Sequence, residues 1–166
     1  MKWSKLKKNI EDKFADCLKD RVHIYTTRYT TGSYYMVRGW ITIDKEEIAN
    51  FSTPDNNNKY GWNTPDIDER IIPEKRTEGL TVEKGEFSRY DFTDACFDYL
   101  NMNIDEAVSS QNPIIISFAM LDRRLGKRRL KLLKQKDRTD QHPLVLKMLD
   151  LRIQCENMNQ ELGIRN

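Results

Sequence analysis

Histidine, cysteine, glycine and proline are all scarce in this chain of 166 residues, and each scarcity excludes a class of protein. Two histidines and three cysteines leave little material for a zinc site or a disulfide framework. Seven glycines and five prolines exclude collagen-like and low-complexity chains, and an aromatic content of 10% argues against a disordered one. We therefore expect a folded protein with a hydrophobic core.

Long apolar runs are also missing. The longest, residues 114–121, falls well short of the roughly 20 residues that a membrane-spanning helix needs, so we expect no membrane segment. The basic start of the chain is followed by polar residues instead of an apolar stretch, which excludes a standard secretory signal. The wide spacing of Cys17, Cys96 and Cys155 favours reduced thiols in a cytoplasmic protein.

The common sequence signatures of catalysis do not occur: there is no serine-hydrolase elbow, P-loop or dinucleotide fingerprint. His23 lies in a predicted strand and His142 precedes a proline at a predicted helix start, positions typical of packing and capping. The carboxylates Asp91, Asp94 and Asp98 form a row that is typical of a solvated helix face. We predict no catalytic residue, no metal ligand and no cofactor. An enzyme with an unrecognised carboxylate-based site stays an alternative.

The periodicity of apolar residues predicts an α+β fold in one domain over residues 1–166. Helical spacing over residues 3–18 precedes period-two alternation over residues 22–51, which predicts an amino-terminal helix packed with an antiparallel β-meander. Residues 52–86 lose all period and are expected to form an irregular connection. Residues 87–166 are predicted to be helical, with a helix start at Asn112-Pro113.

The helical half contains two apolar seams of matching spacing, from Ile114 to Leu132 and from Leu144 to Leu162, joined by a short polar linker. Two such seams predict an antiparallel helix hairpin. The second of these helices carries a further apolar set, which is either buried within the domain or forms a homo-oligomer interface. This set is Leu146, Leu149 and Ile153.

Charge is strongly segregated although the chain as a whole carries only +2. Residues 66–121, the acidic segment, carry a net −7, and residues 122–138, the basic segment, carry a net +7. On a helix, five cations of the basic segment cluster opposite its leucines. These are Arg123, Arg124, Lys127, Lys131 and Lys134. Two interpretations stay open: a surface for nucleic acid, with aromatic residues such as Trp40 or Tyr60 stacking on bases, or a solvated face that pairs partly with the acidic segment.

The aromatic pair Tyr60 and Trp62 lies in the irregular connection and offers a second candidate surface. Aromatic side chains in loops are enriched at protein interfaces, but the same residues also anchor loops on a core. Both interpretations stay open from the sequence alone.

Several runs resemble a family of small bacterial cytoplasmic proteins of uncharacterised function. The similarity extends over nearly the whole chain and implies a bacterial, cytoplasmic protein, but it implies no reaction and no site residues. The matching runs are Trp3-Ser4-Lys5-Leu6-Lys7, Gly39-Trp40-Ile41-Thr42-Ile43-Asp44, Glu47-Ile48-Ala49-Asn50-Phe51, Asn112-Pro113-Ile114-Ile115, Ala119-Met120-Leu121-Asp122-Arg123-Arg124 and Gly126-Lys127-Arg128-Arg129-Leu130.

Taken together, these patterns predict a noncatalytic protein-binding or regulatory module, of the kind that an immunity protein represents. Nucleic-acid binding through the basic segment is the first alternative. The candidate binding residues are Arg123, Arg124, Lys127, Lys131, Lys134, Tyr60 and Trp62. Whether the basic segment faces solvent or the acidic segment is the question that a structure has to answer.

Overall fold

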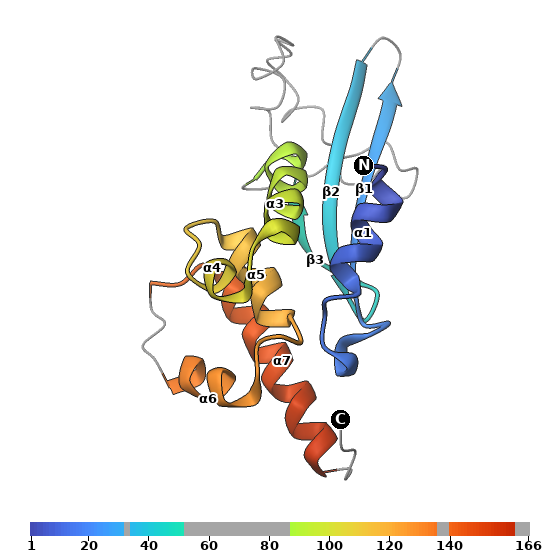
Figure 1. Cartoon of the computed structure of the whole chain (residues 1–166). Helices are drawn as coiled ribbons and strands as arrows, with labels where there is room; N and C mark the ends of the chain where they lie inside the picture. The colour runs from blue at the N-terminus through green and yellow to red at the C-terminus, as the bar shows by residue number, and fades with distance from the viewer. Residues whose placement is uncertain (32–33, 52–86, 136–139, 162–166) are drawn as a thin grey trace. The chain divides into compact units, whose positions relative to one another are not determined.

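The computed structural model describes residues 1–31, 34–51, 87–135 and 140–161, and its α+β architecture confirms the predicted fold class (Figure 1). Contacts group the chain into two compact units. The helical unit comprises Met1–Arg21 and Ala95–Asn166, and the sheet unit comprises Val22–Asp94. The amino-terminal helix therefore groups with the carboxy-terminal helices instead of with the meander that follows it in sequence.

The sheet unit contains the predicted meander as three antiparallel strands in the order β1-β2-β3. β1 (Val22–Thr31) pairs with β2 (Tyr34–Ile43), and β2 pairs with β3 (Glu46–Phe51). The β2–β3 connection is a two-residue turn in which Asp44 and Lys45 have φ values of 51° and 74°. Two successive positive φ values match the right-handed twist of a hairpin, so this turn sets the pairing next to it. Farther along the pair the register shifts between Ile41 and Thr42.

One face of the sheet carries the core of this unit, as the alternation over β2 predicts. Ile24 and Ile41 face each other across β1 and β2 and are fully buried. The Phe92 ring stacks on Phe51 with ring centroids 4.4 Å apart. A Cβ atom on Gly39 would lie only 2.6 Å from Cδ1 of Phe92, so the absence of a side chain at Gly39 lets this ring approach the sheet.

The helical unit begins with α1 (Trp3–Glu11), which is shorter than the predicted helix over residues 3–18. Beyond α1 the chain extends and forms an antiparallel bridge between Phe14 and Asp122, followed by the short 3₁₀ helix η1 (Asp16–Leu18). The Ala15 N–H donates to the Leu121 carbonyl, and the Arg123 N–H donates to the Lys13 carbonyl, both over 2.9 Å. These two hydrogen bonds take the place of those that a continuing helix would form. Phe14 is nevertheless buried, as the apolar spacing predicts.

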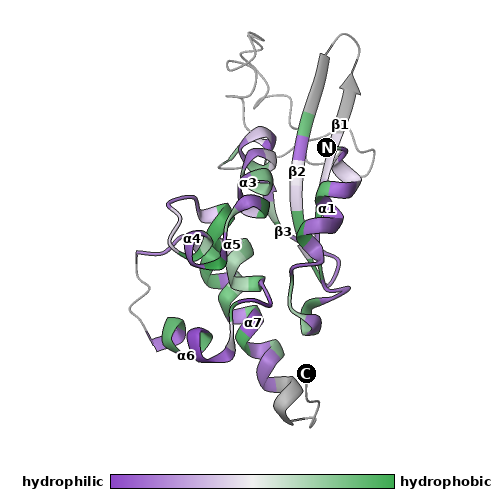
Figure 2. Ribbon diagram, in the orientation of Figure 1, coloured by the Kyte–Doolittle hydropathy of each residue, from purple (hydrophilic) through white to green (hydrophobic). Residues whose placement is uncertain are grey.

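The remaining helices begin close to where the sequence predicts. α5 (Pro113–Leu121) and α7 (Pro143–Glu161) confirm the predicted starts. α3 (Arg89–Asn101) and α4 (Ile104–Val108) lie within the segment that is predicted to be helical. Asn112 caps α5 by accepting a hydrogen bond from the Ile114 N–H, and His142 caps α7 by accepting one from the Leu144 N–H through Nδ1. α5 is apolar on nearly all sides and almost wholly buried, and it packs along α7 (Figure 2).

The first helix of the predicted hairpin is in fact two helices. α5 ends at Leu121 and α6 (Lys127–Gln135) begins six residues later, so the prediction of a single helix from Ile114 to Leu132 is wrong. At the break, the backbone of Asp122 is extended, with φ −67° and ψ 131°. The buried guanidinium of Arg152 on α7 supplies the physical reason, because it donates to the carbonyls of Leu121 and Asp122 over 2.9 and 3.1 Å.

Candidate binding surface

The described part of the basic segment, residues 122–135, occupies the turn after α5 and the whole of α6. Arg123 and Arg124 lie in the turn, whereas Lys127, Lys131 and Lys134 lie on α6. The sequence predicts that these five cations share one helical face. This prediction is wrong, because the helix is interrupted between Leu121 and Lys127. Their individual surroundings therefore decide which of them can meet a partner.

The turn is anchored by the carboxylate of Asp122, which is completely buried. Tyr99 of α3 donates its hydroxyl to Oδ2 over 2.6 Å, and Arg124 donates through Nε and its terminal nitrogen over 2.9 and 2.6 Å. Burial opposes ionisation of Asp122, but the hydrogen bonds from Arg124 and Tyr99 outweigh it and hold the pKa of this carboxyl below its usual value. The pKa of Tyr99 is raised, mainly by burial and to a smaller extent by the adjacent charge of Asp122.

Arg124 is therefore held by the fold. Besides its bonds to Asp122, its other terminal nitrogen lies 3.4 Å from the Met102 carbonyl, just beyond the end of α3. Lys13 donates to the Leu100 carbonyl over 3.2 Å at the same helix end. Burial and the neighbouring Arg124 charge lower the pKa of Lys13. Both cations thus satisfy carbonyls at the carboxyl end of α3, where the helix dipole favours positive charge.

A buried ion pair on α7 holds the start of α6. Arg152 and Glu156, one turn apart on α7, are both buried, and Nε of Arg152 donates to Oε1 of Glu156 over 3.0 Å. Nζ of Lys127 lies 3.5 Å from the other oxygen, Oε2. That separation permits an ion pair but is too long for a strong hydrogen bond, so Oε2 has no hydrogen-bond partner among the described residues. Lys127 is thereby directed toward α7.

The acidic segment contributes little to neutralising the basic one within the described residues. Among the described residues, one ion pair joins the two segments: Arg129 pairs with Asp105 of α4 over 2.6 Å. Arg128 is exposed on α6 and forms no ion pair with the described residues.

The outward face of α6, defined by Arg128, Lys131, Leu132 and Gln135, points away from the core. At 100° per residue these four positions lie within one sector, opposite the buried Leu130 and the half-buried Leu133. Leu132 is 53% exposed, so an aliphatic side chain projects among cations. Lys134 is exposed but lies about 60° outside this sector. A surface that combines exposed cations with an exposed leucine suits a partner that is both acidic and apolar.

The candidate binding residues thus separate into two groups. All five side chains are exposed, but Arg124 and Lys127 pair with carboxylates of the helical unit, whereas Arg123, Lys131 and Lys134 form no ion pair with the described residues. It adds Arg128 and Leu132 to the surface. The other two candidates, Tyr60 and Trp62, lie outside the described residues.

Trp40 of the sheet unit does not offer a free ring face for stacking. Tyr25 on β1 stacks against it with centroids 5.1 Å apart, and the Arg38 guanidinium lies 4.9 Å from its centroid. Nε of Arg38 donates to Asn50 on β3 over 3.0 Å, which places this guanidinium on the β3 side of the ring. Because β2 lies between β1 and β3, Trp40 is flanked on both sides, and the geometry does not favour base stacking there.

The apolar set proposed for a homo-oligomer interface is largely covered in the chain itself. Leu149 is buried, and Leu146 and Ile153 are half-buried. α5 is the helix that packs most extensively along α7. The set therefore contributes to the core of the helical unit more than to its surface.

Sequence reasoning missed Arg152 and Leu132 for different reasons. Arg152 falls between the two apolar sets of α7, and nothing in its spacing distinguishes a buried arginine from an exposed one. Leu132 completes the apolar seam that begins at Ile114 only if the helix is continuous. The signal for a break was Asp122 followed by Gly126, since aspartate favours turns and glycine lowers helix propensity.

Comparison with known proteins identifies a family. The model of the SF0329 protein family matches residues 2–153 of this chain. No curated protein and no solved structure matches it significantly. In the described ranges, no helix is long and apolar enough to cross a membrane, and no group of three His, Cys, Asp or Glu side chains is placed to hold a metal ion.

Proposed function

The chain belongs to the SF0329 protein family, and we propose that it acts as a noncatalytic binding module whose α6 docks on an acidic protein surface. The observation that carries this proposal is the outward face of α6, where Arg128 and Lys131 flank an exposed Leu132. The buried anchors at Asp122 and Arg152 support it, because they hold the start of α6 in one position and so lower the entropy lost on binding.

Leu132 distinguishes a protein partner from nucleic acid. Phosphate backbones are bound by arginine, lysine and small polar groups, and bases are bound by aromatic rings or polar side chains. An exposed leucine adds little to either contact. In a protein interface the same leucine can fill an apolar pocket, while the surrounding cations pair with carboxylates at its rim. The combination therefore favours a protein over a nucleic acid, which stays the alternative.

Site-specific photo-crosslinking tests the proposal in cells. A photoreactive benzoylphenylalanine in place of Gln135 lies on the outward face of α6, and the same group in place of exposed Lys147 on α7 is the matched control. We expect a protein adduct from position 135 that position 147 does not give. Mass spectrometry then identifies the crosslinked segment, which should be rich in Asp and Glu and contain an apolar residue.

Affinity measurements with the purified partner provide the decisive comparison. Leu132→Ser and Lys131→Ala should each weaken binding by about tenfold or more, as expected for residues at the centre of an interface. Lys147→Ala should leave the affinity unchanged. Adducts consisting of RNA or DNA would favour the nucleic-acid alternative, and equal adducts from both positions would contradict the proposal.

The cellular setting is part of the same proposal. The motif resemblance supports a bacterial source, and the three free cysteines, Cys17, Cys96 and Cys155, are consistent with a reducing cytoplasm. Fractionation of cells that express the tagged chain tests this assignment. Recovery outside the cytoplasmic fraction would overturn it.

A further inference from the structure

α3 carries an outward face that is opposite in character to that of α6. Its buried side contains Ala95, Cys96 and Tyr99. At 100° per residue, Phe97 and Asp98 lie on the other side of the helix. Both are exposed, and Phe97 is 37% exposed. We define Phe97 and Asp98, which both belong to the helical unit, as the outward face of α3.

The outward faces of α3 and α6 are complementary in charge and alike in having one exposed apolar side chain. Apart from Met1, Phe97 and Leu132 are the large hydrophobic residues that are exposed in the described part of the chain. The carboxylate of Asp98 accompanies Phe97, and cations accompany Leu132. Such a match has the two elements of a specific contact, an apolar centre and a rim of opposite charges.

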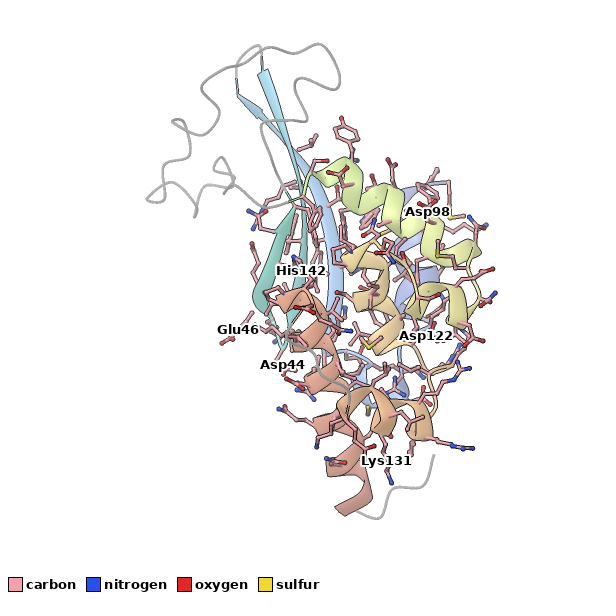
Figure 3. The ribbon with its side chains drawn as sticks, turned by 90° about the vertical axis from the view of Figure 1, so that its left-hand side faces the viewer. Asp44, Glu46, Asp98, Asp122, Lys131 and His142 are labelled. Carbon is pink, nitrogen blue, oxygen red and sulfur yellow. The ribbon has the colours of Figure 1, made fainter. Side chains whose placement is uncertain are left out.

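The two faces do not meet within one copy. Asp98 and Lys131 both belong to the helical unit, and Figure 3 shows them well separated, on α3 and α6 respectively. Neither forms an ion pair within the described residues. Lys131 therefore has no access to Asp98 of its own chain, although each presents an exposed charge to solvent.

We infer that the outward face of α6 binds the outward face of α3 on a second copy of this chain. The inference rests on the proposed function, since it uses the same α6 surface and names its acidic partner. In a pair with two-fold symmetry, the α3–α6 contact forms twice, so even a modest helix–helix contact is doubled. The segregated charges of the sequence would then be cancelled between two molecules.

Charge exchange tests this inference, and the substitutions lie at exposed positions where folding is not at stake. Analytical ultracentrifugation over a range of concentrations measures self-association of the unaltered chain, of Lys131→Glu and of Asp98→Lys. We expect each single variant to weaken self-association by about tenfold or more, because it sets like charges against each other. Circular dichroism confirms that each variant is folded.

The mixture of the two single variants is the decisive measurement. In a mixed pair, Asp98 of the Lys131→Glu chain meets Lys131 of the Asp98→Lys chain, and the two substituted positions meet each other with opposite charges. We therefore expect mixing to restore self-association. Leu132→Ser and Phe97→Ser provide an independent arm, since each should weaken the pair without any change of charge.

The inference would be overturned by a chain that stays monomeric at every concentration, or by single variants that associate as the unaltered chain does. Recovery in a chain carrying both substitutions, without recovery in the mixture, would place the contact within one copy and overturn it as well. If the chain is monomeric but position 135 crosslinks a different acidic protein, the proposed function stands and the second copy is the wrong partner.

Discussion

Replacing Asp122 by Asn should strongly destabilise the helical unit. The carboxylate is fully buried and accepts hydrogen bonds from the Tyr99 hydroxyl, from the Arg124 guanidinium and from the Arg124 N–H over 2.8 Å. Asn keeps the shape but removes the charge, and it turns an amide N–H₂ toward donors. Arg124 is partly exposed, so its charge is not left fully buried, but the buried Tyr99 hydroxyl loses its acceptor. Leaving a buried hydrogen-bonding group unsatisfied costs about 1–3 kcal/mol, and we expect an effect in this range.

Urea unfolding followed by circular dichroism measures this loss of free energy of unfolding. Asp12→Asn is the matched control, because Asp12 pairs with Lys8 at an exposed site and such pairs contribute less than about 1 kcal/mol. A cost for Asp122→Asn no greater than that of the control would refute the view that this carboxylate holds the turn between α5 and α6.

The pH dependence of the same variant provides a second test. The folded-state pKa of Asp122 is lowered, so its stabilisation is fully present above the unfolded value of about 3.9 and is lost as the pH falls through the lower folded value. The difference in stability between the unaltered chain and Asp122→Asn should therefore be constant near neutral pH and shrink toward acid. A difference that grows below pH 4 would contradict this account.

Three further predictions concern other parts of the chain. Gly39→Ala should cost about 1–3 kcal/mol in urea unfolding, because its Cβ atom would lie 2.6 Å from the Phe92 ring; an unchanged midpoint would show that the ring moves freely. Asn112→Ala should lower the free energy of unfolding by about 1 kcal/mol, because it removes the cap of α5. Asn112→Asp should retain most of the stabilisation that the cap provides. Burial, helped by a hydrogen bond with Cys155, raises the pKa of Cys17 to about 12. Alkylation of Cys17 by iodoacetamide at pH 8 should therefore be on the order of a thousandfold slower in the native protein than in urea. Mass spectrometry measures the labelling, and rapid labelling of the native protein would count against this assignment.

The sequence predicts secondary structure well where local signals decide it. The strands, the Asn112-Pro113 start and the His142 cap are found at the expected positions because alternation and capping act over a few residues. The helix over residues 3–18 and the single helix after Ile114 fail for one shared reason. Phe14 and Asp122 pair with each other across more than a hundred residues, and this contact overrides helical spacing in both segments.

The candidate site follows the same division. Composition alone locates the basic segment, but it cannot show which cations the fold holds, because their partners are distant in sequence. Glu156 lies 29 positions after Lys127, and the Asp105 that pairs with Arg129 lies 24 positions before it. Arg124 is the exception, because its partner Asp122 is only two residues away. The Asp122 side chain accepts a hydrogen bond from the backbone N–H of Arg124, and such a bond is typical of an aspartate in a turn.

The net +7 of the basic segment therefore overstates what a partner meets. Lys127 and Arg129 lie against carboxylates outside the segment, so their charges are largely neutralised at short range and add little to the field outside. The pairing of Arg124 with Asp122 is already counted in the net +7. Arg128 and Lys131 have no such carboxylate among the described residues and surround Leu132 on the outward side of α6. Two or three cations around an apolar centre give a shallow dependence of binding on salt, since few counterions are released. A steep dependence, with a slope near the full charge of the segment, would instead require Arg124 and Lys127 to leave their buried partners, which the anchors at Asp122 and Glu156 oppose.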